Sequence, residues 1–174
     1  MLMESTLSIQ TFPHDIETIG NYEVNFILRS VDSTNHLASL IASKCNKGDV
    51  ITLQGDLGTG KTTFARGFIN SFFPNKENVN SPSFNILQTY NTPQNEIWHY
   101  DLYRIKNKNE LNEIGLDEGF SKAISVIEWP EMVAGELPKN RLEINLGMSV
   151  DNTSRKITLV GVGYWSKLLR EMFS

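Results

Sequence analysis

The chain has 174 residues, a length that suits one domain with a sizeable apolar core. Hydrophobic residues make up 40% and charged residues 21% of the chain, an ordinary balance for a soluble globular protein. The net charge of −4 argues against a basic protein that coats nucleic acid, and the single cysteine, Cys45, excludes an internal disulfide and argues against a structural zinc site.

We do not expect the N-terminal segment to be a secretory signal. Residues 1–20 lack a basic stretch followed by an apolar one, so we interpret them as a short flexible extension. No apolar run in the chain reaches the roughly 18 to 20 residues that a membrane-spanning helix needs. We therefore expect a single domain over residues 21–174, in the cytoplasm and without a membrane anchor.

The first half of this domain predicts two strands and two helices. Residues 22–28 have strand composition, and Ser33 is expected to cap a helix in which apolar residues recur at helical spacing. The apolar run over 50–54 predicts a central parallel strand that is buried on both faces. A glycine-rich turn follows it, and a helix is expected over about 61–73, ended by Pro74.

The second half alternates strands with short helices. A loop becomes a strand within residues 79–90, and residues 97–105 are expected to return as its antiparallel partner. Residues 107–114 predict a short helix. The remaining elements are three strands and a C-terminal helix, at 123–129, 142–148, 156–162 and 164–173. Because strands and helices interleave from residue 50 onward, we expect an α/β fold with a mostly parallel central sheet flanked by helices and one antiparallel hairpin.

The glycine-rich turn carries the clearest chemical signal in the chain. Residues 55–62, GDLGTGKT, match the pattern G-x-x-x-x-G-K-[ST] in full, between a predicted strand and a predicted helix. Glycines let the backbone approach phosphate oxygens, and the loop N–H groups and helix N-terminus offer them a positive potential. Lys61 would supply a charge to the β- and γ-phosphates, and Thr62 a hydroxyl to Mg²⁺. The motif predicts a P-loop that binds a nucleoside triphosphate, but it leaves the reaction open.

Two acidic residues could complete a metal and catalytic site. A P-loop enzyme needs a carboxylate near Mg²⁺, and in an open parallel sheet the ligand lies at the carboxyl ends of the strands. Glu128 ends an apolar strand just before Pro130, so it is the expected metal ligand. Asp101 lies in the strand before and is better suited to orient or deprotonate a water molecule. Either residue could instead be a solvated or salt-bridged acid at a strand end.

Three further features allow more than one interpretation. The hydroxyls of Ser81-Pro82-Ser83 are positioned like a switch segment that senses a γ-phosphate or Mg²⁺, or they belong to a plain turn. His99 lies two residues before Asp101 and could tune that carboxylate, line the site, or simply pack. Trp129 follows Glu128 and is expected to point to the opposite face and pack there, whereas exposure beside the site would suggest contact with the nucleotide or a partner protein.

Five blocks in a fixed order resemble one protein family. GDLGTGKTTFARGF, SPSF, HYDLYR, ELNEIGLDE and VIEWPE follow one another as in the TsaE (YjeE) family of small bacterial P-loop ATPases. The resemblance covers about residues 30–160, and the HYDLYR and IEWPE blocks are more specific than the P-loop. The chain departs from the family at Ser83, where a threonine is usual, but the hydroxyl is kept.

The resemblance implies a function, partners and site residues. It implies an ATPase that acts with TsaB and TsaD homologues in threonylcarbamoylation of adenosine 37 of tRNA (t6A) and meets tRNA only through that assembly. Lys61 and Asp101 would be catalytic, and Thr62 and Glu128 would hold Mg²⁺. The residues implied in ATP binding are Gly55, Gly58, Thr59, Gly60, Lys61, Thr62, Thr63, Thr34 and Arg155.

Three other functions remain open from the sequence. A small-molecule kinase usually has an arginine-bearing lid, and no arginine-rich segment follows Glu128. A GTPase is suggested only by residues 107–110, NKNE, in which Glu110 stands where the guanine-reading N-K-x-D motif has aspartate. A scaffold that binds ATP and only bridges its partners would fit the acidic net charge.

Overall fold

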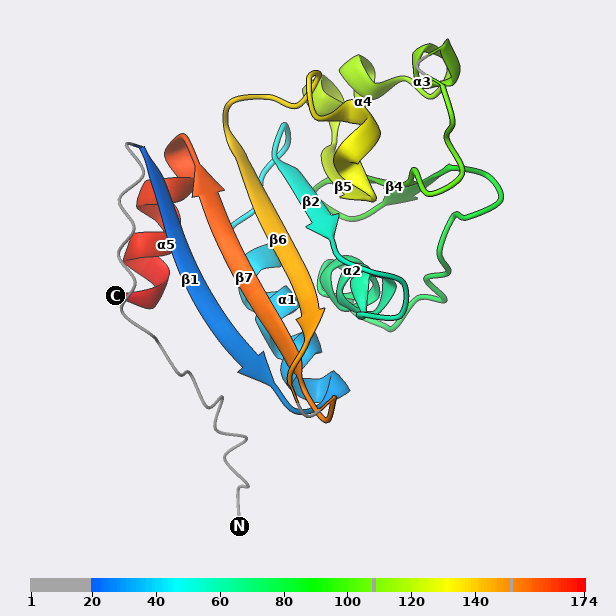
Figure 1. Ribbon diagram of the computed structural model, residues 1–174. Coiled ribbons are helices and arrows are strands. Elements are labelled where there is room, and N and C mark those ends of the chain that lie inside the picture. Colours follow the sequence, from blue (N-terminus) through cyan, green and yellow to red (C-terminus); the bar gives the residue numbers. More distant parts are fainter. Residues whose placement is uncertain (1–19, 108, 151) are drawn as a thin grey trace.

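One mixed sheet forms the frame of the molecule (Figure 1). The computed structural model describes residues 20–107, 109–150 and 152–174, and within them the sheet has seven strands in the order β1-β7-β6-β2-β5-β4-β3. The strands are β1 (Asn21–Leu28), β2 (Val50–Gln54), β3 (Leu87–Asn91), β4 (Glu96–Asp101), β5 (Ile124–Glu128), β6 (Arg141–Met148) and β7 (Arg155–Val162). Residues 1–19 lie outside the described residues, so the flexible extension expected there stays a prediction.

The centre of the sheet is parallel, and both of its edges are antiparallel. β4, β5, β2 and β6 run parallel to one another, β3 is antiparallel to β4, and β7 is antiparallel to β6 and β1. The expected α/β fold with a mostly parallel central sheet and an antiparallel hairpin is confirmed. The second antiparallel pairing follows from chain length, because residues 149–154 are too few for the crossover of about a dozen residues that parallel neighbours need.

Helices cover both faces of the sheet. They are α1 (Val31–Ala42), α2 (Lys61–Asn70), α3 (Asn109–Glu113), α4 (Leu116–Lys122), the 3₁₀ helix η1 (Pro130–Val133) and α5 (Tyr164–Phe173). Figure 1 shows α1 and α5 behind β1, β7 and β6, and α4 beside β5 at the opposite end of the sheet. None of the helices in the described residues is long and apolar enough to cross a membrane.

Two apolar clusters hold these layers together. The larger one joins α1, α2 and α5 to the sheet and includes the fully buried Phe68 and Trp165. The smaller one joins α3, α4 and η1 to the other face through Tyr100 and Ile127. β2 contributes to both clusters, because Val50 and Ile51 point to opposite faces. Its burial on both sides explains the uninterrupted apolar run, and it fixes the loop after β2 between two packed layers.

The helix α4 was not expected from the sequence. It contains Gly119, which favours neither helix nor strand, and the segment is too short for a clear period. A side chain at position 119 would meet the hydroxyl of Tyr100 and the ring of Trp98. The glycine therefore lets α4 pack closely on β4, a tertiary reason that no local pattern contains.

Three predicted boundaries differ from the structure. The N-cap of α1 is Ser30 and not Ser33, because the Ser30 hydroxyl accepts from the Ser33 amide while the Ser33 hydroxyl accepts from the Ser30 amide. α2 ends at Asn70, before the proline that was expected to stop it. The strand expected to reach residue 105 ends at Asp101, where the amide of Leu102 turns to donate to the carbonyl of Glu128.

Replacing Ser30 with alanine is expected to lower the free energy of unfolding by about 1 kcal/mol, because one helix-end amide loses its side-chain acceptor. Chemical denaturation measures this change. Ser39→Ala, at an exposed position within the same helix, is the matched control and should be neutral or slightly stabilising. Equal stability of the Ser30 variant and the parent chain would contradict the capping assignment.

Candidate active site

The loop between β2 and α2 follows a path that requires glycine, with positive φ at Gly55, Gly58 and Gly60. Gly60, the N-cap of α2, has a φ of 106°, which side chains other than glycine rarely adopt. A Cβ on Gly55 would meet the carbonyl oxygen of Leu146 and lie 2.8 Å from the hydroxyl of Thr59. The loop can therefore take this path only with glycines at these positions. The result is a cradle of amides at a helix N-terminus, which suits phosphate groups.

Lys61 lies across this cradle. Its Nζ donates to the carbonyl oxygens of Gly55 at 2.6 Å and Asp56 at 2.8 Å, and it lies 3.8 Å from the ring centroid of Trp129. Burial lowers the pKa of Lys61, while the carboxylates of Glu128, Glu131, Asp101 and Asp56 act in the opposite direction. The ammonium group is held over the loop by oxygens that phosphate oxygens could replace.

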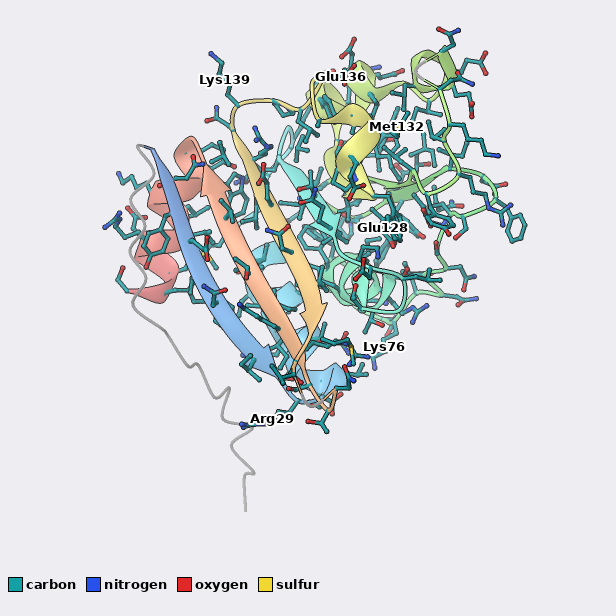
Figure 2. The ribbon with its side chains drawn as sticks, in the orientation of Figure 1. Arg29, Lys76, Glu128, Met132, Glu136 and Lys139 are labelled. Carbon is teal, nitrogen blue, oxygen red and sulfur yellow. The ribbon has the colours of Figure 1, made fainter. Side chains whose placement is uncertain are left out.

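Glu128 and Thr62 form a pair of oxygen donors beside the cradle. The Thr62 hydroxyl donates to Glu128 Oε2 at 2.9 Å, and His99 Nε2 lies 2.8 Å from Glu128 Oε1. Figure 2 shows Glu128 at the junction between the strand ends and α2. A hydroxyl and a carboxylate are hard ligands of the kind that Mg²⁺ uses together with phosphate oxygens and water. The donor set therefore fits the magnesium site that the sequence predicts.

Asp101 lies next to this pair, since it is the register partner of Glu128 on the neighbouring strand. Its Oδ2 accepts from the hydroxyls of Ser81 at 2.6 Å and Ser83 at 2.9 Å, and its Oδ1 accepts from the Tyr103 amide at 3.1 Å. The segment of Ser81 and Ser83 is thus tied to the predicted catalytic carboxylate and is more than a plain turn. Its role as a γ-phosphate sensor stays a prediction.

Two cavities adjoin the loop and share Gly58, Gly60 and Thr63. The first has a volume of about 310 Å³, and the predicted site residues that line it, besides the shared ones, are Lys61, Thr62, Asp101 and Glu128. The second has a volume of about 270 Å³ and is lined by Thr59, Thr34 and Arg155 together with the β1–α1 connection. Gly55 lines neither cavity, and its lack of a side chain lets the loop pass close to the backbone of Leu146. The loop thus borders both cavities.

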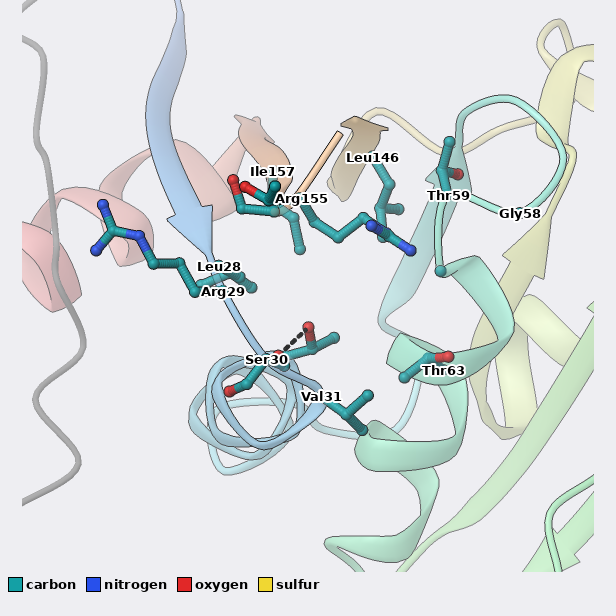
Figure 3. A pocket seen from close by; sticks show the side chains of 14 residues that line it. Leu28, Arg29, Ser30, Val31, Gly58, Thr59, Thr63, Leu146, Arg155 and Ile157 are labelled. Carbon is teal, nitrogen blue, oxygen red and sulfur yellow. Dashed lines mark hydrogen bonds between the residues drawn. The ribbon is translucent and has the colours of Figure 1, made fainter. Parts of the chain in front are cut away.

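Figure 3 shows the second cavity, with Arg155 reaching from the start of β7 toward the loop. Arg155 Nε lies 3.9 Å from the point that a Cβ on Gly60 would occupy, so its charge is close to the phosphate cradle. Thr34 is less available, because its hydroxyl donates to the Ser30 carbonyl within the first turn of α1. Arg155 therefore lies beside the phosphate loop, whereas the Thr34 hydroxyl already has a backbone acceptor.

Sequence reasoning missed several cavity residues. Leu28, Arg29 and Val31 line the second cavity from the β1–α1 connection, which carries no motif of its own. Trp129 was expected on the opposite face, but its φ of 59° ends the strand alternation and turns it into the first cavity. Its ring lies 4.8 Å from that of Tyr103, centroid to centroid. Left-handed backbone at a non-glycine residue has no reliable signal in a single sequence.

His99 was expected to tune Asp101, to line the site or to pack within the strand; it is buried, and its side-chain contact is with Glu128. His99 and Asp101 lie on the same face of β4, as the two-residue period of a strand requires. The pairing of β4 with β5, however, brings Glu128 within reach of the imidazole ring. Cross-strand register decides this contact, and register cannot be obtained from the order of residues within one strand.

The comparisons with known proteins agree with one another. A family model described as "Threonylcarbamoyl adenosine biosynthesis protein TsaE" matches residues 28–157. The "tRNA threonylcarbamoyladenosine biosynthesis protein TsaE" of Rickettsia bellii is 40% identical over 126 residues, which cover 72% of this chain and 88% of that protein. The protein of the same name from Bacillus subtilis is 38% identical over 144 residues, or 82% of this chain and 89% of the relative. The crystal structure of Bacillus subtilis YdiB superimposes with a TM-score of 0.71 at 31% identity, covering 87% of this chain and 94% of YdiB.

Proposed function

The chain belongs to the TsaE family, and from that premise we propose that it binds and hydrolyses ATP to support threonylcarbamoyladenosine biosynthesis on tRNA. One observation carries the proposal. The P-loop lysine, the Thr62–Glu128 pair and Asp101 line one cavity, and a second cavity adjoins the same loop. Such an arrangement suits a nucleotide whose γ-phosphate lies near both a metal site and a carboxylate.

Each residue has a defined part in this proposal. Lys61 exchanges its two carbonyl partners for the β- and γ-phosphate oxygens and neutralises part of their charge. Thr62 and Glu128 hold Mg²⁺, which when bound draws charge from the β- and γ-phosphates. Asp101 orients the attacking water and takes up its proton once the hydroxyls of Ser81 and Ser83 have left its Oδ2.

We further infer that homologues of TsaB and TsaD are the partners of this chain and that tRNA is met only through them. Support comes from the rim of the first cavity, where apolar side chains are unusually exposed. Leu57 is 78%, Phe84 84% and Tyr103 56% exposed, and large exposed apolar groups near a site often mark protein contacts. The net charge of −4 also favours a protein partner over direct binding to a polyanion.

Reconstitution tests the proposal directly. The purified chain is mixed with TsaB and TsaD homologues, threonylcarbamoyl donor and tRNA, with and without ATP, and t6A and ADP are both measured. We expect repeated turnovers of t6A only when this chain and ATP are both present, with ADP and phosphate as the other products. Equal turnover in the absence of the chain would contradict the proposal.

The GTPase alternative receives no support from the site. Asn107 and Glu110 of the NKNE segment hydrogen-bond to each other, and neither is among the residues that line the two cavities. A guanine-reading role for this segment therefore lacks a geometric basis. Competition between ATP and GTP for binding to the chain measures which nucleotide it prefers. Phosphoryl transfer to a small metabolite in place of water would revive the kinase interpretation.

A further inference from the structure

The imidazole of His99 is fully buried beneath the proposed metal site. Its exposed fraction is 0%, and that of Glu128, its partner across the strands, is 2%. His99 is not among the residues that line either cavity, so the ring does not face the space that a nucleotide would fill. Any effect on the reaction must therefore pass through Glu128.

The two ring nitrogens differ in their surroundings. Nε2 lies 2.8 Å from Glu128 Oε1, whereas Nδ1 is buried and has no hydrogen-bond partner within the described residues. A proton on Nδ1 would leave a buried N–H group unpaired, which is costly. A proton is therefore assigned to Nε2, which donates it to the carboxylate.

This hydrogen bond gives the two carboxylate oxygens of Glu128 different partners. Oε1 is held by His99, and Oε2 accepts from Thr62 on the side of the P-loop. A glutamate with one fixed oxygen can rotate little about its last bond, so the other oxygen stays directed at the loop. Partners that orient metal ligands in this way commonly raise metal affinity.

We propose that His99 is a positioning residue that fixes Glu128 Oε1, so that Oε2 is pre-aligned for a divalent cation bound with the nucleotide. The inference rests on the proposed function, because it assumes that Thr62 and Glu128 form a Mg²⁺ site. A merely structural histidine would instead stabilise the fold and leave the contribution of the cation to nucleotide binding unchanged.

The variants His99→Gln and His99→Asn separate these two roles. The terminal amide of Gln extends about as far as Nε2 and keeps a donor for Glu128, whereas that of Asn ends near the position of Nδ1 and cannot reach it. Both are neutral polar side chains of similar burial cost. Tyr100→Phe, on the opposite face of the same strand, is the control for altered packing of β4.

The measurement is the affinity for a non-hydrolysable ATP analogue in EDTA and in excess Mg²⁺, by isothermal titration calorimetry. We expect His99→Asn to reduce the gain from Mg²⁺ about 10- to 100-fold, with little change in EDTA, and His99→Gln to restore most of it. If Mg²⁺ raised the affinity of the Asn variant as much as that of the parent chain, His99 would have no role as a donor to Glu128. An equal loss of this Mg²⁺ effect in both variants would contradict that role as well. If the parent chain itself gained nothing from Mg²⁺, the proposed metal site would fail first.

A second measurement needs no variant. Nitrogen-15 NMR of the three histidines in the parent chain, with His99 identified by sequential resonance assignment, reports which ring nitrogen carries the proton. We expect a proton on Nε2. A ring that carries its proton on Nδ1 alone would overturn the inference even if both variants failed to fold.

Discussion

Replacing Lys61 with alanine is expected to weaken ATP binding by about 10- to 100-fold, because a charge-assisted contact to phosphate contributes roughly 1.5 to 3 kcal/mol. Hydrolysis should fall further, since the same ammonium group would stabilise the charge that develops on the γ-phosphate. Lys61→Met refines the experiment, because methionine keeps an apolar stem against Trp129 and removes only the charge. Calorimetry measures binding, and release of phosphate measures hydrolysis.

The matched control is Lys76→Ala, which removes an exposed lysine from the loop after α2. It changes the net charge by the same amount and should leave both quantities within about twofold, because exposed charges are screened. Lys61 also donates to two loop carbonyls, so unfolding should be compared in all variants. A Met variant that binds and hydrolyses ATP like the parent chain would show that Lys61 does not contact the phosphates.

The P-loop could be predicted in detail because its constraints are local. Residues 55–62 encode the turn, the helix start and the charged side chain within one short window. Glu128 was expected at the carboxyl end of a buried strand for a topological reason, and the hydrogen bond from Thr62 is consistent with that expectation. In both cases a pattern along the chain carries the geometric information.

The contacts that sequence reasoning missed depend on where separate strands meet. His99 lies beneath Glu128 only because β4 and β5 pair in one register, and a shift by one residue would turn it to the other face. Trp129 enters the cavity because its backbone is left-handed, and the helix α4 forms because Gly119 admits the Tyr100 hydroxyl. These features depend on tertiary packing, so a single sequence does not reveal them.

Replacing Asp101 is expected to separate binding of ATP from its hydrolysis. Asp101→Asn keeps the size of the side chain and one acceptor for the serine hydroxyls, but it cannot take up a proton. Hydrolysis should therefore fall about 10²- to 10⁴-fold, the usual contribution of a general base, while ATP binding changes little. The same two assays used for Lys61 measure both effects, and undiminished hydrolysis by this variant would rule out the proposed base.

Asp101 also anchors a loop, so its loss has two possible consequences that must be told apart. The double variant Ser81→Ala and Ser83→Ala removes the hydroxyls that contact Oδ2 but leaves the carboxylate. If Asp101 only held the loop, this double variant would lose as much hydrolysis as Asp101→Asn. If Asp101 activates water, the double variant should retain most hydrolysis, because the carboxylate no longer has to exchange two hydroxyls before it can accept a proton.

The Asp101→Ala variant also discriminates between an ATPase and a scaffold. In a reconstituted assay with TsaB and TsaD homologues, a protein that only bridges its partners needs bound ATP but no hydrolysis. Asp101→Ala should still bind ATP, since the P-loop and Lys61 are unchanged, and under the scaffold interpretation it would support full t6A formation. We expect instead that t6A formation stops after about one turnover, because the complex is not reset without cleavage of the γ-phosphate. Continued turnover would remove hydrolysis from the proposed function while leaving the nucleotide site intact.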